Sequence, residues 1–361
     1  MRILFVTPSI GYGGAAKMLT FVANQLCARG HWVSIINLNL TTSEISQNVD
    51  GQVKIFNISG RELGRLGQLR QIIRIARQEK AQLLVGFRVN PNLYVCLAGK
   101  LLGIPSIMSE RGDPNRTFGK NWRNRLLRWI INRCDGAVFQ TAGAGTFYGK
   151  GLQRRGTVIP NPIFIKGKIP VTSLKEREKT VVSVGRLDNQ QKRYDIMLQA
   201  FQRFSQKHPE YVLKLYGSGP DEQQILAWMQ ELGITERVQM MGVTKQPMQD
   251  IAHDGMFIIT SDFEGISNSL LEAMAVGLPC VSTDHTPGGA RLLITDHENG
   301  LLAPVGDVEK LADAMCEFAE NPQLAYDCGE KAREVLERFD GNRIINMWES
   351  YCQKIAGKKS Q

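Results

Sequence analysis

Short apolar runs alternate with amphipathic segments through both halves of the chain. The first half contains four apolar runs that predict buried strands, at 2–9, 31–38, 81–87 and 105–110. Between them lie three segments with helical periodicity, at 16–30, 66–80 and 92–103. Strands that are apolar throughout and separated by helices are typical of parallel sheets with helices on both faces.

The second half repeats this alternation. It contains five predicted strands, at 179–187, 211–220, 238–242, 255–262 and 279–284, and three predicted helices, at 194–207, 221–232 and 269–276. The stretch between the halves, 158–180, has three prolines and a charge run, as expected of a linker. We therefore predict an α/β protein with two Rossmann-like, doubly wound domains facing a cleft. In such sheets, ligands bind beyond the carboxyl ends of the strands.

Composition narrows the classes of protein to consider. The chain has 361 residues, 43% of them hydrophobic and 22% charged, as expected of a soluble protein with two domains. It has no apolar run of transmembrane length and no secretory signal pattern. Its seven cysteines are scattered, without a Cys-x-x-Cys pair, which predicts reduced thiols, no metal site and a cytoplasmic location. The net charge of +9 comes without a nucleic-acid-binding motif, so we expect no nucleic acid partner.

Glycines and charged residues follow the predicted strands of the second half. Gly185 and Arg186 follow the first strand, the run 217–220 follows the second, and Lys192 comes six residues after Arg186. Residues 265–269 precede a predicted helix and would present free backbone N–H groups, which bind anions. Two cations beside a helix N-terminus suit a diphosphate.

Two acids flank that helix start in "SDFEGISNSLLEAMAVGLP", residues 261–279. Glu264 and Glu272 are eight residues apart, with small polar residues after Glu264. A carboxylate accepts hydrogen bonds from the adjacent hydroxyls of a sugar. The segment therefore predicts a site that holds a diphosphate between sugar hydroxyls.

These motifs resemble the retaining glycosyltransferases of family 4, which have two Rossmann-like domains in the GT-B arrangement. The resemblance covers nearly the whole chain and is strongest over 180–306. It implies that Arg186 and Lys192 neutralise the donor diphosphate, that Glu272 binds the ribose and that Glu264 contacts the transferred sugar. It also implies that no bound metal or other cofactor is needed.

The same resemblance implies roles for the domains and for the residues that bind the donor. Residues 1–163, joined by a C-terminal helix at 341–357 that crosses back, would bind the acceptor, and residues 164–340 the nucleotide sugar. The donor-binding residues would be Gly13, Gly14, Gly185, Gly217, Gly219, Val243, Gly265, Ile266, Ser267, Asn268, Ser269 and Glu272.

Two further segments look closest to enzymes that extend lipid-linked sugars for bacterial surface polysaccharides and N-glycans. They are "SERGDP" at 109–114 and "TDHTPGGARLLI" at 283–294. This implies a UDP-sugar as donor and a saccharide on a polyprenyl diphosphate as acceptor. The transferred sugar that we expect first is N-acetylgalactosamine or galactose. The chain departs from the family in having Arg193 where a glycine is more usual. Glu110 and Arg111 stand on the acceptor side, where many members carry a histidine.

Two alternatives use the same predicted fold. Gly11–Ala16, "GYGGAA", matches a dinucleotide-binding fingerprint, but the second strand ends with Asn37 and Asn39 instead of the acid that binds a ribose. An NAD-dependent enzyme is therefore the weaker alternative. A UDP-sugar epimerase of the same fold is the stronger one.

Residues 116–134 combine basic and apolar positions and contain no acid. Trp122, Leu126, Trp129 and Ile130 share one helical face, and Arg123, Arg125 and Arg128 are among the interspersed basic residues. This pattern fits both a helix that lies in a membrane interface and an ordinary packed helix. The local excess of basic charge and the lipid-linked acceptor that the resemblance implies favour the membrane interface. We expect peripheral binding to the anionic cytoplasmic leaflet, with Arg123 and Arg128 holding the acceptor's anionic head group.

Overall fold

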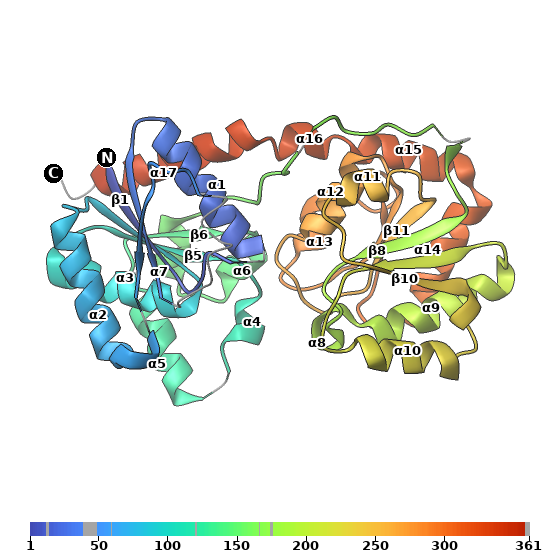
Figure 1. The fold of residues 1–361 in the computed structure, drawn as a ribbon, viewed down its shortest axis with the longest axis horizontal. Coiled ribbons are helices and arrows are strands. Elements are labelled where there is room, and N and C mark those ends of the chain that lie inside the picture. Colours follow the sequence, from blue (N-terminus) through green and yellow to red (C-terminus); the bar gives the residue numbers. More distant parts are fainter. Residues whose placement is uncertain are drawn as a thin grey trace. The chain divides into compact units, whose positions relative to one another are not determined.

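The chain consists of two compact units, whose helices and strands are labelled in Figure 1. The computed structural model describes residues 1–11, 14–38, 49–58, 60–119, 121–165, 167–173 and 176–357. Unit 1 comprises Met1–Pro162 and Gly341–Gln361, and unit 2 comprises Ile163–Asp340. The boundary thus falls between Pro162 and Ile163.

Unit 1 is built on a parallel sheet of seven strands. Its strands are β1 (Arg2–Thr7), β2 (Trp32–Asn37), β3 (Lys54–Asn57), β4 (Leu83–Phe87), β5 (Ser106–Glu110), β6 (Gly136–Phe139) and β7 (Gly156–Val158). Its helices are α1 (Gly14–Ala28), α2 (Gly60–Gln78), α3 (Val89–Leu102), α4 (Pro114–Thr117), α5 (Trp122–Ile131), α6 (Ala142–Thr146), α7 (Lys150–Arg155) and α17 (Gly341–Gly357).

Unit 2 is built on a parallel sheet of six strands. Its strands are β8 (Thr180–Val184), β9 (Val212–Tyr216), β10 (Val238–Gly242), β11 (Met256–Ile259), β12 (Cys280–Thr283) and β13 (Leu301–Ala303). Its α-helices are α8 (Asn189–Lys192), α9 (Tyr194–Lys207), α10 (Glu222–Glu231), α11 (Pro247–Asp250), α12 (Asn268–Ala275), α13 (Gly289–Leu293), α14 (Val308–Glu320), α15 (Pro322–Ala332) and α16 (Val335–Arg338).

The two sheets share one pattern of strand order. The first three strands of each unit are added in one direction across the sheet, and the fourth lies on the other side of the first strand, where the later strands continue. The order is β3-β2-β1-β4-β5-β6-β7 in unit 1 and β10-β9-β8-β11-β12-β13 in unit 2. Every pair of neighbouring strands is parallel, as β1 with β2 and with β4 illustrates. This is the order of a doubly wound fold, whose switch point lies between the first and fourth strands. The predicted fold class is confirmed.

Alternating side chains explain why helices cover both faces of each sheet. In β1, Ile3 and Phe5 join a buried cluster with residues of α1 and α17, whereas Leu4 and Val6 join one with residues of α2 and α3. Because successive side chains of a strand point to opposite faces, an apolar strand needs an apolar layer on each side. The strands of unit 2 divide their side chains between two clusters in the same way.

The C-terminal helix α17 completes the core of unit 1. Trp348 is fully buried and stacks on Phe87 of β4, with ring centroids 5.7 Å apart. The Tyr351 hydroxyl accepts a hydrogen bond of 2.8 Å from the backbone N–H of Ala137 in β6. The last helix is therefore part of the first unit's hydrophobic core. Across the described residues, none of the helices has both the length and the apolar character needed to cross a bilayer.

Candidate functional site

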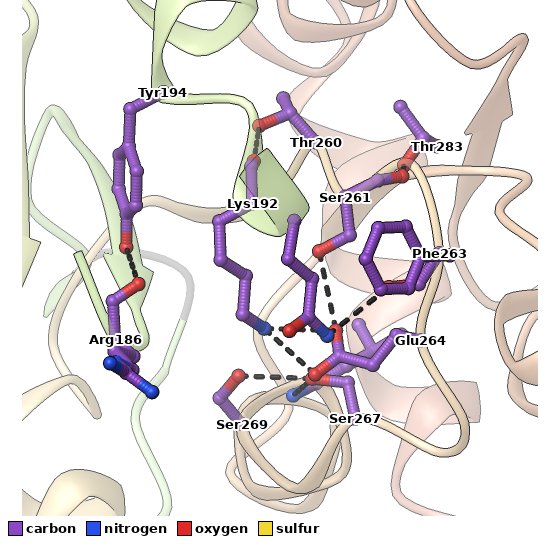
Figure 2. A network of polar contacts seen from close by, with 12 residues as sticks. Arg186, Lys192, Tyr194, Thr260, Ser261, Phe263, Glu264, Ser267, Ser269 and Thr283 are labelled. Carbon is purple, nitrogen blue, oxygen red and sulfur yellow. Dashed lines mark hydrogen bonds and ion pairs between the residues drawn. The ribbon is translucent and has the colours of Figure 1, made fainter. Parts of the chain in front are cut away.

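An ion pair joins the ends of two neighbouring strands in unit 2. Lys192 is the last residue of α8, which follows β8, and Glu264 lies in the loop after β11. Since β8 and β11 are adjacent in the sheet, residues that are 72 positions apart come together. The Lys192 ammonium nitrogen lies 2.8 and 2.9 Å from the two Glu264 carboxylate oxygens (Figure 2). Their side chains are only 11% and 17% exposed.

The surroundings of Glu264 favour its ionised form. Burial alone would raise the pKa of this carboxyl group, but the positive charge of Lys192 and the hydrogen bonds to the carboxylate outweigh that effect and lower it. One of these hydrogen bonds comes from the Ser261 hydroxyl, at 3.2 Å. Glu264 therefore presents a fixed negative charge beside a fixed positive one.

Further hydrogen bonds fix the backbone on both sides of this pair. The Thr260 hydroxyl donates to the carbonyl of Lys192 at 2.8 Å, and the Gln191 side chain donates to the carbonyl of Phe263 at 3.2 Å. The Thr283 hydroxyl, at the end of β12, donates to the carbonyl of Ser261 at 2.6 Å. The loops after β8 and β11 and the end of β12 are thus joined into one polar network (Figure 2).

Arg186 contrasts with Lys192 in having an exposed side chain. Its guanidinium group makes no hydrogen bond or ion pair to any residue that the structure describes, whereas its carbonyl accepts a hydrogen bond of 3.3 Å from the Tyr194 hydroxyl (Figure 2). Tyr194 is fully buried, so it holds the backbone of Arg186 in place. The guanidinium remains available to an anion from solvent.

Three glycines of the site pack backbone against backbone. A Cβ atom on Gly217 would lie 1.8 Å from the carbonyl oxygen of Gly185, and one on Gly219 would lie 2.2 Å from that of Leu187. A Cβ atom on Gly289 would lie 1.6 Å from the carbonyl oxygen of Gly265. No side chain fits at these positions, so the loops after β8, β9, β11 and β12 pack tightly at the carboxyl edge of the sheet.

Helix α12 begins directly after this network. Ser267 is its N-cap and accepts a hydrogen bond from the backbone N–H of Leu270 at 3.4 Å, while its hydroxyl lies 3.1 Å from that of Ser269. Asn268 is the first helical residue, and Glu272 lies buried in the next turn. The helix N-terminus predicted from the sequence is present, next to Glu264.

The other predicted donor-binding residues have different settings. Ile266 is buried in the core of unit 2, and Val243 is exposed just after β10. Gly14 begins α1 in unit 1, and Gly13 lies outside the described residues. Their roles in donor binding stay predictions.

Arg193 adopts the left-handed backbone conformation that favours glycine, with φ of 54°. Its guanidinium binds both oxygens of Asp195, at 3.0 and 2.9 Å, and also binds Asp262 at 3.1 and 3.2 Å. The hydrogen bonds to Asp195 raise the pKa of Arg193 further. An arginine in place of the usual glycine is therefore stabilised here by the carboxylates of Asp195 and Asp262. The sequence analysis identified neither of them.

His285 was also missed from the sequence. It is 1% exposed, it follows β12, and neither ring nitrogen has a hydrogen-bond partner among the described residues. Burial lowers the pKa of its imidazole, against the attraction of the Glu264 charge. A neutral histidine thus lies close to the Lys192–Glu264 pair. A single histidine in a loop gives no periodic signal that could have revealed this.

The residues predicted for the acceptor side lie in unit 1. Glu110 is 4% exposed and accepts hydrogen bonds from the Tyr148 hydroxyl at 2.6 Å and from the backbone N–H of Arg111. Burial raises the pKa of the Glu110 carboxyl group and lowers the pKa of the Arg111 guanidinium to about 9. Arg111 binds Asn161 and the carbonyl of Ile159. These contacts stabilise the end of β5, and a role toward an acceptor stays a prediction for both residues.

Two family models match consecutive parts of the chain. "Glycosyltransferase Family 4" matches residues 12–165, and "Glycosyl transferases group 1" matches residues 166–335. The chain belongs to the family 4 glycosyltransferases. It is an enzyme that transfers sugars. The family assignment argues against both alternatives, the NAD-dependent enzyme and the UDP-sugar epimerase.

Relatives of similar length support the assignment. An uncharacterized glycosyltransferase of Haemophilus influenzae is 26% identical over 96% of this chain and 98% of its own. An alpha-1,4-N-acetyl-D-galactosaminyltransferase of Campylobacter jejuni, which acts on a GalNAc-containing saccharide on PP-undecaprenol, is 24% identical over 96% of this chain and 97% of its own. The crystal structure of Anabaena HepE in complex with UDP superimposes with a TM-score of 0.83, at 19% identity over 97% of this chain and 99% of that one. This structural likeness confirms the GT-B fold.

Proposed function

We propose that this glycosyltransferase moves a hexose or an N-acetylhexosamine from a UDP-sugar to a saccharide carried on a polyprenyl diphosphate, with retention of anomeric configuration. N-acetylgalactosamine and galactose are the preferred donor sugars. The product would be an intermediate of a surface polysaccharide such as an O-antigen, a capsule or an exopolysaccharide. Two kinds of relative support this proposal: the Campylobacter enzyme acts on a saccharide on PP-undecaprenol, and the Anabaena structure contains UDP.

The observation that carries the proposal is the charge arrangement at the carboxyl edge of the unit 2 sheet. The exposed Arg186 and the paired Lys192 supply two positive charges, and the N-terminus of α12 adds a partial one. Such groups bind a diphosphate and stabilise the charge that develops on it as the glycosidic bond breaks. Glu264 and Glu272 provide acceptors for the hydroxyls of the sugar and the ribose.

The transfer step can be written with these groups. The bond between the sugar's anomeric carbon and the diphosphate oxygen breaks, and a bond to the acceptor hydroxyl oxygen forms on the same face of the sugar. The hydroxyl proton passes to the departing diphosphate, so the products are the glycosylated acceptor and UDP. Arg186 and Lys192 act as fixed charges opposite the diphosphate, and Glu264 holds the Lys192 ammonium in place.

The test is an assay of radiolabelled UDP- and GDP-sugars with a polyprenyl-diphosphate-linked saccharide, followed by determination of the product's anomeric configuration. We expect transfer from one UDP-sugar with retention. Arg186→Ala and Lys192→Ala should each lower turnover by about 10²-fold or more, because each removes a charge facing the leaving group. An inverted product, or full turnover by both folded variants, would refute the proposal.

We also propose that unit 1 binds the anionic cytoplasmic leaflet through α5. Trp122, Leu126 and Trp129 lie on one face of this helix and are 69%, 46% and 56% exposed. The other apolar residues of the helix, Leu127, Ile130 and Ile131, pack on the core of unit 1. The helix therefore has a second apolar face that no described residue covers. Ile130, predicted to share the first face, is half-buried.

Basic side chains accompany the exposed aromatic rings. The guanidinium groups of Arg123 and Arg133 lie over the rings of Trp122 and Trp129, at 5.7 and 3.2 Å from the ring centroids. Arg128 instead lies over the ring of Phe147, at 4.6 Å. Exposed tryptophans with arginines around them are typical of helices that lie in the membrane interface. Attraction to anionic lipid contributes about 1 kcal/mol per basic residue near the surface.

A further inference from the structure

A second cluster of reactive side chains lies in unit 2 outside the Lys192–Glu264 site. His208 follows α9, and Cys316 and Glu320 are four residues apart on α14. One ligand atom from each, the ring nitrogen, the sulfur and a carboxylate oxygen, lie within 4.8 Å of one another. We propose that His208, Cys316 and Glu320 bind a Zn²⁺ ion that links the end of α9 to α14. The sequence predicted no metal site, because no spacing motif connects these three residues.

The chemistry of the three groups favours zinc. Imidazole nitrogen, thiolate sulfur and carboxylate oxygen are the ligands that zinc takes in proteins, and sites with three protein ligands leave a fourth position to water. Harder cations such as Mg²⁺ and Ca²⁺ prefer oxygen ligands alone. Residues four apart on a helix project from the same face, so Cys316 and Glu320 both face His208.

The His208 ring is held in position before any ion binds. It stacks on Phe204, with centroids 5.0 Å apart, and meets the Tyr211 ring edge-on at 6.1 Å. The Nε2 atom is buried and has no hydrogen-bond partner among the described residues. It lies 3.4 Å from a Glu320 oxygen, close enough for an ion pair but without hydrogen-bond alignment. A buried ring nitrogen that faces a carboxylate without a hydrogen bond is suited to a metal.

The other two ligands differ in mobility. Cys316 is 6% exposed and fixed within the core, whereas the Glu320 side chain is 58% exposed. Ligand atoms around tetrahedral zinc lie roughly 3 to 4 Å apart, so closing the cluster requires a contraction of about 1 Å. The exposed Glu320 side chain can make that adjustment by changing rotamer. Two helices that already pack together need not move.

Zinc binding would change the protonation of Cys316. Burial raises the pKa of its thiol, so the metal-free cluster carries Cys–SH. On binding, the Zn–S bond replaces the S–H bond, and the proton passes to solvent without any change of oxidation state. The ion would join the end of α9 to the C-terminal part of α14, whereas the Arg203–Glu309 ion pair already links α9 to the first turn of α14.

The test uses the full chain, reduced and freed of metal by a chelator, titrated with Co²⁺ and Zn²⁺ alone. We expect one equivalent of Co²⁺ to bind with a thiolate charge-transfer band, which Zn²⁺ then displaces. Zinc should also raise the midpoint of thermal unfolding by a few degrees, because it binds the folded protein preferentially. Cys316→Ser should lose the band, and the exposed change Glu320→Gln should weaken binding by roughly tenfold or more.

Cys27→Ser is the matched control, because Cys27 is the more accessible thiol of unit 1 and lies outside the cluster. This variant should bind Co²⁺ as the wild type does. A wild-type protein that binds no equivalent, or a band that survives Cys316→Ser or disappears with Cys27→Ser, overturns the proposal. If Cys316→Ser does not fold, unchanged Co²⁺ binding by both His208→Gln and Glu320→Gln would overturn the proposal instead. None of these results depends on sugar transfer.

Discussion

At the scale of single residues, Lys192 and Glu264 form a pair whose members depend on each other. Each side chain is largely removed from water, and the Lys192 charge keeps Glu264 ionised. Removing one partner of such a pair leaves the other charge without compensation, which costs more than the pair itself contributes. In the proposed function, the pair would therefore hold an ammonium group for the diphosphate without burying a lone charge.

We expect His285 to make the protein's stability dependent on pH. Burial lowers the pKa of its imidazole, so the folded protein takes up a proton there less readily than the unfolded chain. The stability that His285 contributes is present above about pH 6.5 and is lost as the pH falls below that value. We expect the free energy of unfolding to fall more steeply between about pH 7.5 and about pH 5.5 for the wild type than for His285→Gln. Urea titrations measure this, and parallel pH dependences would contradict it.

The sequence predicted the charged residues of the site better than their partners. Arg186, Lys192 and Glu264 follow strands, and Glu272 lies in the helix after Glu264; the carboxyl ends of parallel strands meet at one edge of a sheet. The direct Lys192–Glu264 contact was not predicted, because it depends on two side-chain conformations. The carboxylates that hold Arg193 were missed for the same reason.

At the scale of elements, the loop before α12 depends on a close approach to the start of α13. The carbonyl oxygen of Gly265 occupies the space that a side chain on Gly289 would need. We expect Gly289→Ala to lower the free energy of unfolding by about 1–3 kcal/mol, as overpacking does. Turnover should fall as well, because the loop carries Glu264. Gly51→Ala is the control, since nothing lies within 4 Å of its Cβ position. Equal stabilities of the two variants, measured by urea unfolding, would contradict the tight approach.

Helix α5 gives a prediction about membranes. We expect the wild type to float with liposomes of anionic lipid at low salt, and to be released by salt, which screens the attraction. Arg123→Gln with Arg125→Gln should weaken the association roughly tenfold or more, as should Trp122→Ser with Trp129→Ser. Arg128 is left unchanged, because it packs on Phe147.

Matched variants elsewhere in unit 1 test whether membrane binding depends on α5 itself or only on the protein's total charge and exposed apolar surface. Arg70→Gln with Arg74→Gln removes the same charge from exposed positions of α2, and Leu101→Ser removes an exposed apolar side chain of α3. Both control proteins should float as the wild type does. If they are released equally, or if the wild type stays in the soluble fraction, α5 is not a membrane interface.

The strands that the sequence analysis missed are all short. Long apolar runs such as those of β1 and β4 are unambiguous, whereas β3, β6, β7 and β13 have only three or four residues each and were not identified. Such short strands give too few positions for a periodic signal, and pairing with longer neighbours defines them. Helix α2 begins earlier than predicted because it continues across a kink at Gly64.

At the scale of the whole molecule, unit 1 is built from both ends of the chain. Trp348 of α17 is buried against Phe87 of β4. We expect Trp348→Ala to lower the free energy of unfolding by about 3–5 kcal/mol, the usual cost of emptying an aromatic core site. Trp122→Ala is the control, because Trp122 is exposed and should change stability by less than about 0.5 kcal/mol. Similar losses in the two variants, in urea titrations, would show that α17 does not support the core.

The two-unit architecture was predictable because each half of the chain repeats the same alternation of strands and helices. The association of α17 with the first sheet was not visible in its own sequence. Its apolar face fits any sheet, and it was assigned to unit 1 from the family resemblance alone. Contacts such as that of Tyr351 with Ala137, 214 positions apart, are what define the partner of α17.

Calorimetric titration with UDP tests the central claim most directly, because it requires neither the donor sugar nor the acceptor to be known. If the charges beyond β8 hold the diphosphate and Glu272 holds the ribose, Arg186→Ala, Lys192→Ala and Glu272→Ala should each raise the dissociation constant by about tenfold or more. Lys310→Ala, which removes an exposed charge from α14, should bind UDP as the wild type does. Unchanged UDP affinity in the folded Arg186 and Lys192 variants would contradict the account.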